Sequence, residues 1–165
     1  MNEKQLSWLG GLWDGEGSIT VWKAIRSNNA ERYNPSLVLT NTSDLIINEA
    51  TKILDLMGVR MHIILLKRDG TNAKDCYQLT TRKLESVQRF CEVMIPYLIG
   101  KRPQAELTLR FIKSRLKNLE DVNGKGKGCW KKSPYSEEEI SLSEQLQRMN
   151  KKGRCESSET KRLTL

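Results

Sequence analysis

Residues 9–18 read LGGLWDGEGS, an apolar helical stretch that ends in two carboxylates interleaved with glycines. A helix needs one glycine to stop, and this stretch has four, at Gly10, Gly11, Gly15 and Gly17. Glycine in a helix interior costs about 1 kcal/mol relative to alanine, so Gly10 and Gly11 predict a close contact that offsets this loss. Gly11 and Gly15 lie four residues apart on one helix face, where a second backbone can approach closely. The stretch therefore predicts a mate helix.

The length and composition of the chain are typical of one soluble globular domain. It has 165 residues, of which 38% are hydrophobic and 29% charged. No apolar run approaches the roughly 20 residues of a membrane-spanning helix, and the start, MNEKQLSWLGG, lacks the features of a secretory signal. We therefore expect an intracellular protein, in a prokaryotic cytoplasm or inside an organelle.

The formal net charge of +8 indicates a polyanionic partner. The first 100 residues carry a net charge of +1 and the last 65 carry +7, so the surplus lies towards the C-terminus. Lysines gather in the stretch NGKGKGCWKKSP, a basic connector, and the tail adds Lys151, Lys152 and Arg154. These side chains are candidates for phosphate contacts, and a solvated charge run is an equally good interpretation. Trp130 is a candidate anchor of the connector on the domain.

The cysteine and histidine content argues against a zinc site. The four cysteines, Cys76, Cys91, Cys129 and Cys155, form no CxxC pair, and His62 has no metal-ligand spacing around it. We expect Cys76 and Cys91 to be small buried hydrophobes and the other two to be incidental thiols. Disulfides become plausible only in the intracellular protein of a hyperthermophile.

Hydrophobic periodicity and turn signals predict an αββαββα order. The predicted elements are a helix at 3–14, strands at 18–26 and 34–41 around a polar loop, a helix from 43 or 44 to 57, strands at 61–68 and 75–81, and a helix at 83–94. A further helix starts near Pro103, and Ser136 with Glu139 forms a capping box ahead of a helix at 137–149.

Asp14 and Glu16 lie where the first helix gives way to the first strand. If two copies of this helix pack side by side, two Glu16 carboxylates converge at one end of the pair. Oxygen ligands brought together near a polyanion favour Mg²⁺. If only the four residues DGEG at 14–17 are considered, the alternative to a metal site is an ordinary helix C-terminus whose acidic side chains are solvated.

The whole string resembles the motif that names the LAGLIDADG homing endonucleases. The match runs through Leu9, Gly11, Leu12, Asp14, Gly15, Glu16, Gly17 and Ser18, with Gly10 for alanine, Trp13 for isoleucine and Glu16 for the final aspartate. The αββαββα order is the core of that family. The resemblance therefore implies an α+β fold with a four-stranded twisted antiparallel sheet and additional C-terminal helices. It implies a nuclease core at 1–117, followed by a connector, helix and tail at 118–165.

The resemblance also implies a mechanism. Chains with one motif act in this family as homodimers, with paired motif helices at the interface, here Gly10, Gly11, Asp14 and Gly15. Glu16 and the Gly15 backbone carbonyl would hold Mg²⁺ or another divalent cation that activates water and stabilises the leaving oxygen. The product would be a staggered double-strand break in a long pseudo-palindromic DNA target. Glutamate in place of aspartate changes the reach of the ligand, and with it the metal geometry and preference.

Two further residues follow from the resemblance. Asn41, or Thr42 if the spacing differs by one, corresponds to a polar residue that helps position water or metal. Lys101 corresponds to a basic residue near the scissile phosphate and would stabilise charge in the transition state. For Lys101 the alternative is an ordinary surface lysine.

DNA reading is expected from the two hairpins, because a β-ribbon fits the major groove. Strand alternation sends Ile19 and Val21 towards the helices and the residues of opposite parity towards DNA. A register slip of one residue would invert this set. The candidate DNA contacts are Ser18, Thr20, Trp22, Arg26, Arg32, Tyr33, Asn34, Lys67, Arg68, Gln78, Thr80, Lys125, Lys127, Lys131 and Lys132.

Two alternatives to a nuclease belong to the same fold. One is an RNA maturase, which would take the host intron RNA as its partner, and the other is a DNA-binding regulator that does not cleave. The retained acid Glu16, together with Lys101, favours a nuclease over a pure binder. Nothing in the sequence separates a nuclease from a nuclease that is also a maturase.

Overall fold

The computed structural model of the chain describes residues 1–25, 27, 29, 31–67, 74–123 and 134–152. The predicted αββαββα order and the two further helices are confirmed. The elements are α1 (Glu3–Glu16), β1 (Gly17–Ile25), β2 (Glu31–Asn41), α2 (Asp44–Leu56), β3 (His62–Leu66), β4 (Cys76–Thr81), α3 (Leu84–Met94), the 3-10 turn η1 (Ile95–Tyr97), α4 (Arg102–Asn123) and α5 (Glu137–Lys152).

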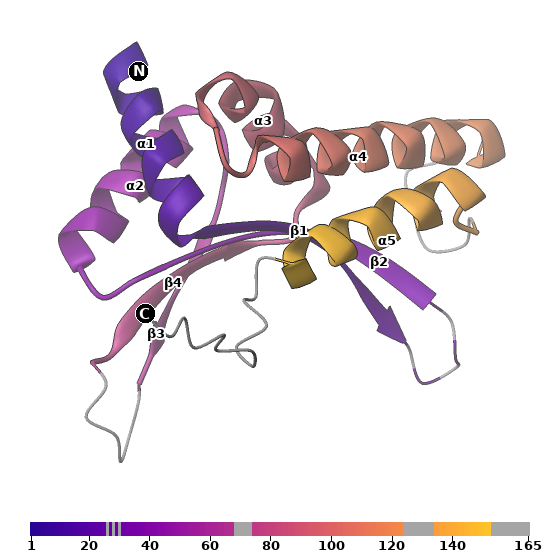
Figure 1. Ribbon diagram of the computed structural model, residues 1–165, viewed down its shortest axis with the longest axis horizontal. Coiled ribbons are helices and arrows are strands. Elements are labelled where there is room, and N and C mark those ends of the chain that lie inside the picture. The colour runs from indigo at the N-terminus through magenta and orange to yellow at the C-terminus, as the bar shows by residue number, and fades with distance from the viewer. Residues whose placement is uncertain (26, 28, 30, 68–73, 124–133, 153–165) are drawn as a thin grey trace, which may run out of the picture.

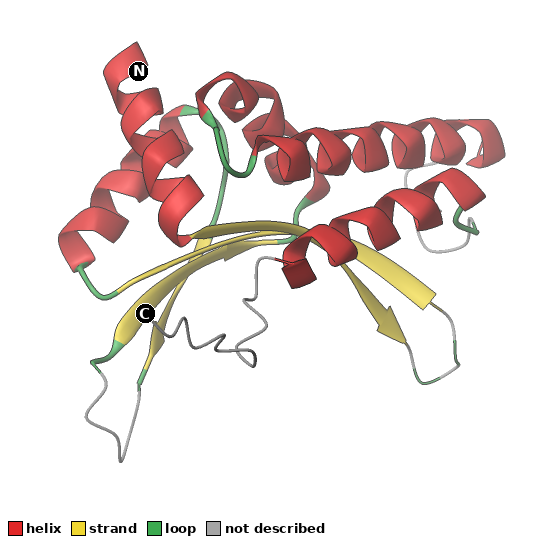
Figure 2. Ribbon diagram, in the orientation of Figure 1, coloured by secondary structure: helices red, strands yellow, loops and turns green. Residues whose placement is uncertain are grey.

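The four strands form one antiparallel sheet in the order β1-β2-β4-β3, so the predicted four-stranded antiparallel sheet is confirmed. Figure 2 shows the described helices on one side of this sheet, while the opposite side is bare of them. The two hairpins bend away from the helices at opposite ends, which makes the bare side concave (Figure 1). We call this bare side the open face. The hydrophobic core fills the space between the sheet and the helices.

Helix α1 begins and ends for local reasons. Asn2 caps it in a capping box, because its side chain accepts from the Gln5 N–H while the Gln5 side chain accepts from the Asn2 N–H. Leu6, Leu9 and Trp13 are buried at helical spacing, as predicted. The helix runs two residues past the predicted end, so Glu16 is its last residue and β1 starts immediately afterwards.

The ends of the later helices carry the capping residues and the glycine that the sequence predicts. Ser43 caps α2 by accepting a hydrogen bond from the Ile46 N–H at 3.4 Å. Gly58 follows the end of α2 with a positive φ of 76°, a conformation that glycine adopts without strain. The capping box of Ser136 and Glu139 at the start of α5 is confirmed in both directions. Helix α5 lies alongside α4, over the part of the sheet formed by β1 and β2 (Figure 1).

The strand bounds differ from prediction mainly at β2. The predicted polar loop ended at Tyr33, whereas β2 already begins at Glu31, because Glu31, Arg32 and Tyr33 pair with Ile25, Ala24 and Lys23 of β1. This longer hairpin extends beyond β4, which pairs only with Leu37–Asn41 of β2. Among the described residues, no helix combines the length and apolar character needed to cross a membrane.

Candidate active site and sheet surface

Glu16 lies at the junction of the motif helix and the first strand. It is the last residue of α1 and is exposed, and Ser18, two residues further on, is exposed at the start of β1. Gly17 between them is in contact with Trp13, because a Cβ at Gly17 would lie 2.5 Å from the indole ring. The helix can turn directly into the sheet only with glycine here. The junction thus fixes the Glu16 carboxylate where the helix layer meets the sheet.

Asp14 has a role that the sequence did not predict. Its carboxylate accepts hydrogen bonds from the backbone N–H groups of Ile99, Gly100 and Lys101 at 2.7, 3.1 and 2.8 Å. Burial acts to raise the pKa of this carboxyl, but the three N–H donors and the Lys101 charge lower it below its ordinary value. The place of Asp14 at a dimer interface stays a prediction, and its carboxylate is already bound within its own chain. Asp14 ties α1 to the loop that leads into α4.

The same tie brings Lys101 to the end of the motif helix. The ammonium of Lys101 donates to the backbone carbonyl oxygen of Asp14, and its backbone N–H donates to the Asp14 carboxylate. Burial lowers the pKa of Lys101 below its ordinary value, while the charges of Asp14 and Glu16 act to raise it. Lys101 is thus held from two sides rather than being a freely solvated surface lysine. A cation and the Glu16 carboxylate share one end of α1.

Gly10 serves a contact inside the chain. A Cβ at this position would lie 2.3 Å from the backbone carbonyl oxygen of Tyr97 in η1. The close contact predicted for Gly10 is thus made with η1 of the same chain, and its place at a dimer interface stays a prediction. Gly11 and Gly15 differ, since both are exposed and a Cβ at either would meet no atom of the described residues within 4 Å. Trp8, 40% exposed, lies one helical turn from Gly11 and extends this uncovered surface.

Asn41 stands at the end of β2, as predicted, with its side chain engaged locally. Its carboxamide oxygen accepts from the Ser43 N–H at 2.8 Å and so shapes the turn into α2. Its neighbour Thr42, the alternative candidate, is exposed. Because the carboxamide oxygen is already bonded, a catalytic role for Asn41 would use its amide nitrogen. This catalytic role stays a prediction.

The predicted alternation along β1 is confirmed. Ile19 and Val21 are buried against the helices, while Thr20 and Trp22 are half-buried on the open face. Residues directly opposite in an antiparallel pair share a face, so the register extends this surface across the sheet. By register with Ser18, Thr20 and Trp22, the open face also carries Arg32, Asn34, Ser36, Val38, Thr40, Gln78, Thr80, His62 and Ile64.

Tyr33 is a wrong prediction among the DNA contacts. It has the opposite parity on β2, is 5% exposed and lies beneath the C-terminal helices. The sequence assignment took Arg32 and Tyr33 from an expected loop and Asn34 from the start of the predicted strand. All three lie in β2, and in a strand only alternate residues share a face. Lys67 is exposed just after β3. Six predicted contacts lie outside the described residues, as does Trp130: Arg26, Arg68, Lys125, Lys127, Lys131 and Lys132.

Sequence reasoning missed an arginine on the open face. The guanidinium of Arg82 lies 4.8 Å from the ring centroid of Trp22, a cation–π contact between the end of β4 and β1. Beside it is a hollow of about 460 Å³, lined by His62, Ile64, Thr80, Thr81, Arg82 and Lys83. Arg82 has the same strand parity as Gln78 and Thr80, so strand alternation could have predicted it on the open face. The predicted end of β4 at residue 81 excluded it.

The donor set at the end of α1 fits a hard cation better than zinc. Among the described residues there is no group of three His, Cys, Asp or Glu side chains that could hold a metal. The Asp14 carboxylate is occupied, which leaves Glu16 and backbone oxygens such as that of Gly15. Mg²⁺ accepts one or two carboxylates and keeps several waters. The residues therefore fit Mg²⁺ when two such ends come together.

The two cysteines that the structure describes follow the prediction. Cys76 and Cys91 are buried, free thiols. Burial, with a smaller effect of the Glu92 charge, raises the pKa of Cys91 to about 12. Cys91 is a small side chain of the hydrophobic core, whereas Cys76 is buried outside that core, on the same strand parity as Gln78 and Thr80. Cys129 and Cys155 lie outside the described residues.

Comparison with known proteins agrees with this fold and motif. The family described as LAGLIDADG-like domain matches residues 3–94. The DNA endonuclease I-CvuI of Chlorella vulgaris is 31% identical over 124 residues, which cover 73% of this chain and 70% of that protein. The crystal structure of the homing endonuclease I-CvuI with a DNA target in the presence of Mg aligns with a TM-score of 0.56 and 24% identity, over 88% of this chain and 96% of that chain. The archaeal intron-encoded homing endonuclease I-Vdi141I, complexed with DNA, aligns with a TM-score of 0.62 and 12% identity, over 89% and 84% of the two chains. The chain belongs to the LAGLIDADG homing endonuclease family.

Proposed function

We propose that this protein is a site-specific homing endonuclease that hydrolyses both strands of a long pseudo-palindromic DNA target to give staggered ends. The observation that carries the proposal is the placement of the exposed Glu16 carboxylate and the tethered Lys101 at the sheet end of the motif helix. Family membership supports it, and so do the relatives that are named as DNA endonucleases.

Each residue at this end of α1 has a distinct task in the proposal. Glu16, with the Gly15 carbonyl, would hold Mg²⁺, and the chemistry that the ion would supply there is activation of water and stabilisation of charge on the leaving oxygen. Lys101 places positive charge beside the scissile phosphate, and its tether to the Asp14 carbonyl fixes that charge in advance. Asn41 orients solvent at the edge of the site through its amide nitrogen.

The functional unit in this proposal is a homodimer. The exposed glycine face of α1, formed by Gly11 and Gly15, lets the backbones of two motif helices approach closely. Trp8 on the same face adds apolar area to the contact. Pairing of α1 with its copy brings two Glu16 carboxylates to one end, so each DNA strand meets one site, and the open faces of two sheets follow the duplex.

The sheet reads the target through its open face. Trp22, Arg32 and Asn34 form the β1–β2 part of this surface, and Gln78, Thr80 and Arg82 form the β4 part. Arginine suits guanine and the amides suit adenine in the major groove. The last 65 residues carry a net charge of +7 and add phosphate affinity without sequence preference.

The test is cleavage of a randomised double-stranded DNA library by the purified protein with Mg²⁺, with the DNA ends sequenced. Glu16→Gln keeps the side-chain size and should lose at least about 100-fold in cleavage, the upper end of the cost of removing an outer-shell partner of a metal ligand. It should retain DNA binding. The matched control is Glu92→Gln, since Glu92 is exposed on α3, away from the junction of α1 and β1. Cleavage by Glu16→Gln at the wild-type rate would contradict the assignment of Glu16. The absence of cleavage by the wild type with any divalent metal would contradict the nuclease proposal itself.

A further inference from the structure

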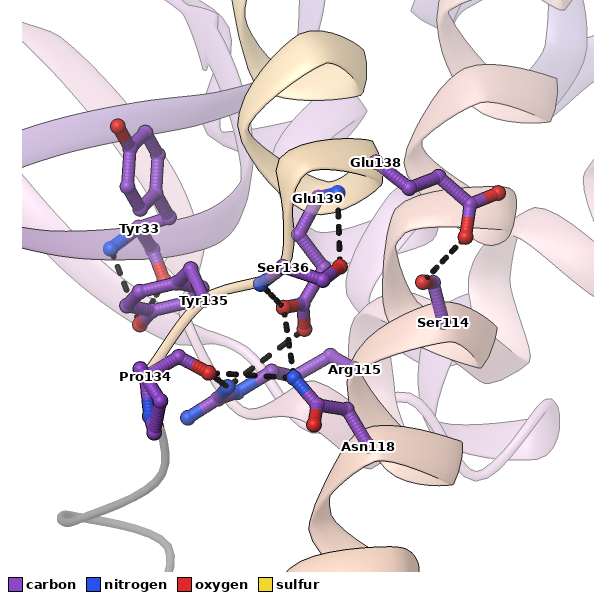
Figure 3. Close-up of polar contacts among 9 residues, drawn as sticks. All are labelled: Tyr33, Ser114, Arg115, Asn118, Pro134, Tyr135, Ser136, Glu138 and Glu139. Atoms are coloured by element: carbon purple, nitrogen blue, oxygen red, sulfur yellow. Dashed lines mark hydrogen bonds and ion pairs between the residues drawn. The ribbon is translucent and has the colours of Figure 1, made fainter.

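A tyrosine just before α5 is bound to the edge of the β1–β2 hairpin. The hydroxyl of Tyr135 accepts a hydrogen bond from the backbone N–H of Tyr33 at 3.1 Å and donates to the backbone carbonyl of Tyr33 at 3.3 Å. Figure 3 shows Tyr135 reaching from the segment before α5 to the backbone of Tyr33. One side chain thus satisfies both backbone groups of one strand residue.

This contact lies on the part of β2 that extends beyond the end of its neighbour β4. β4 pairs with β2 only at Leu37–Asn41, so within the part of the chain that the structure describes, Glu31–Ser36 has a strand neighbour on one side alone, namely β1. A strand edge without a neighbour leaves N–H and C=O groups unpaired, and a two-stranded ribbon is only marginally stable by itself. Tyr135 takes the place that the next strand would hold.

The ring of Tyr135 is fixed by its surroundings. It packs edge-on against the Tyr33 ring with centroids 4.8 Å apart and stacks on Phe111 of α4 at 6.5 Å. The guanidinium of Arg115 lies 4.2 Å from its centroid. A ring held on these sides keeps its hydroxyl aimed at the strand edge before any ligand arrives.

The backbone on both sides of Tyr135 is also held, from α4. The side chains of Arg115 and Asn118 each donate to the Pro134 carbonyl at 3.1 Å. The carboxylate of Glu139, which is fully buried, accepts from the Ser136 N–H and from Asn118, and it pairs with Arg115 at 3.6 Å. These hydrogen bonds fix the backbone of Pro134 and Ser136 on either side of Tyr135. Figure 3 shows these side chains gathered below Tyr135.

We propose that Tyr135 is a positioning residue for DNA recognition, holding the outer part of the β1–β2 hairpin in its binding conformation. This inference rests on the proposed function. The outer hairpin carries Trp22, Arg32 and Asn34 on its open face, and Asn34 is the direct neighbour of Tyr33. Because Tyr135 orders the hairpin in the free protein, DNA binding does not have to. Tyr135 itself lies on the helix side of the sheet and touches no DNA.

The geometry separates recognition from chemistry. Tyr33 pairs with Lys23, six residues along β1 from Gly17, which corresponds to about 20 Å of strand. Glu16 immediately precedes Gly17. Loss of the Tyr135 hydroxyl should therefore weaken binding and base discrimination, while saturating DNA should still be cleaved at the wild-type rate.

The variant Tyr135→Phe tests this because it keeps the ring contacts and removes only the hydroxyl. Two hydrogen bonds at net values near 1 kcal/mol each predict a KM up to about thirtyfold above the wild type, with kcat unchanged. Tyr77→Phe is the matched control, since the Tyr77 hydroxyl makes no hydrogen bond within the part of the chain that the structure describes. An unchanged KM, or a loss confined to kcat, would overturn the inference.

Base discrimination gives a sharper readout than affinity. Arg32→Ala identifies the base pairs that the outer hairpin reads. Tyr135→Phe should lose discrimination at those same base pairs, and the double variant should lose little more than Arg32→Ala alone. Additive effects, or losses at base pairs that Arg32→Ala leaves unchanged, would contradict positioning through this hairpin.

Amide hydrogen exchange tests the inference without any variant. The Tyr33 N–H should exchange slowly in the free wild-type protein, because its bond to Tyr135 forms before DNA binds. Exchange that is fast in the free protein and slows only on DNA would show that DNA orders the hairpin and would overturn the inference. A wild type that neither binds nor cleaves DNA while the Tyr33 amide stays protected would instead overturn the proposed function.

Discussion

Two neighbouring glycines of the motif helix should respond oppositely to the same methyl group. In Gly10→Ala the new Cβ would lie 2.3 Å from the Tyr97 carbonyl oxygen, which belongs to the backbone and cannot rotate away. Ordinary contact needs roughly 1 Å more, so α1 or η1 must shift. Overpacking of this kind costs up to about 3 kcal/mol, and the gain in helix propensity returns about 1 kcal/mol. We expect a net loss near 2 kcal/mol in the free energy of unfolding.

Gly11→Ala is the matched comparison because its Cβ would meet no atom within 4 Å in the described part of the chain. Only the helix propensity changes within the chain, so this variant should gain up to about 1 kcal/mol. The two variants should then differ by roughly 3 kcal/mol. Urea unfolding followed by circular dichroism measures this, at several protein concentrations because coupled dimerisation shifts the midpoint. Equal shifts for the two variants, or a Gly10→Ala protein more stable than wild type, would refute the Tyr97 contact as the reason for Gly10.

Gly11→Ala also tests the proposed pairing of α1 with its copy, because the added methyl group keeps the two helix backbones apart. Sedimentation should show a higher dimer dissociation constant, and an unchanged constant would argue against α1 as the interface. Asp14→Asn should lose about 1–2 kcal/mol of unfolding free energy at pH 7, from weakened hydrogen bonds to a charged acceptor. Because folding lowers the pKa of Asp14, its contribution is present above the unfolded pKa of 3.8 and is lost as the pH falls through the folded value, so the gap to wild type should narrow in acid unfolding curves. Arg82→Ala should relax discrimination at one base pair per half-site by about 1–3 kcal/mol, measured on a panel of substituted targets, whereas uniformly weaker binding would make it a phosphate contact. Cys91, with its pKa raised to about 12, should resist iodoacetamide at pH 8 in the folded protein and react in urea, as seen by peptide mass mapping.

Local patterns predicted the elements because each one carries its own signals. The apolar spacing of α2, its Ser43 cap and Gly58 all lie within 16 residues, and the helix forms at the predicted place. The alternation in β1 was predicted as well, since Thr20 and Trp22 share the strand parity of Ser18 and Ile19 and Val21 have the opposite parity. Where an element continues through polar residues, as β2 does at Glu31–Tyr33, only the pairing with β1 decides, and pairing is not local.

The same distinction explains which site residues were predicted for the right reason. Glu16 lies at a chain junction that the motif itself encodes, so its position followed from the string. Gly10 was correctly identified as a close-contact glycine, but the partner was η1 of the same chain rather than a second helix. A glycine signals close approach and carries no information about what approaches.

Asp14 and Lys101 show how the motif and a distant loop form one site. Their hydrogen bonds span 87 residues of sequence, and each uses a backbone group of the other residue's segment. The Asp14 carboxylate lies where the N–H groups of the loop converge, and the Asp14 carbonyl receives the Lys101 ammonium. A charge pattern in the sequence cannot reveal this, because half of the partners are backbone atoms. The Asp14 carboxylate therefore supports the basic group, and in the proposed mechanism the exposed Glu16 carboxylate would meet the metal and the phosphate.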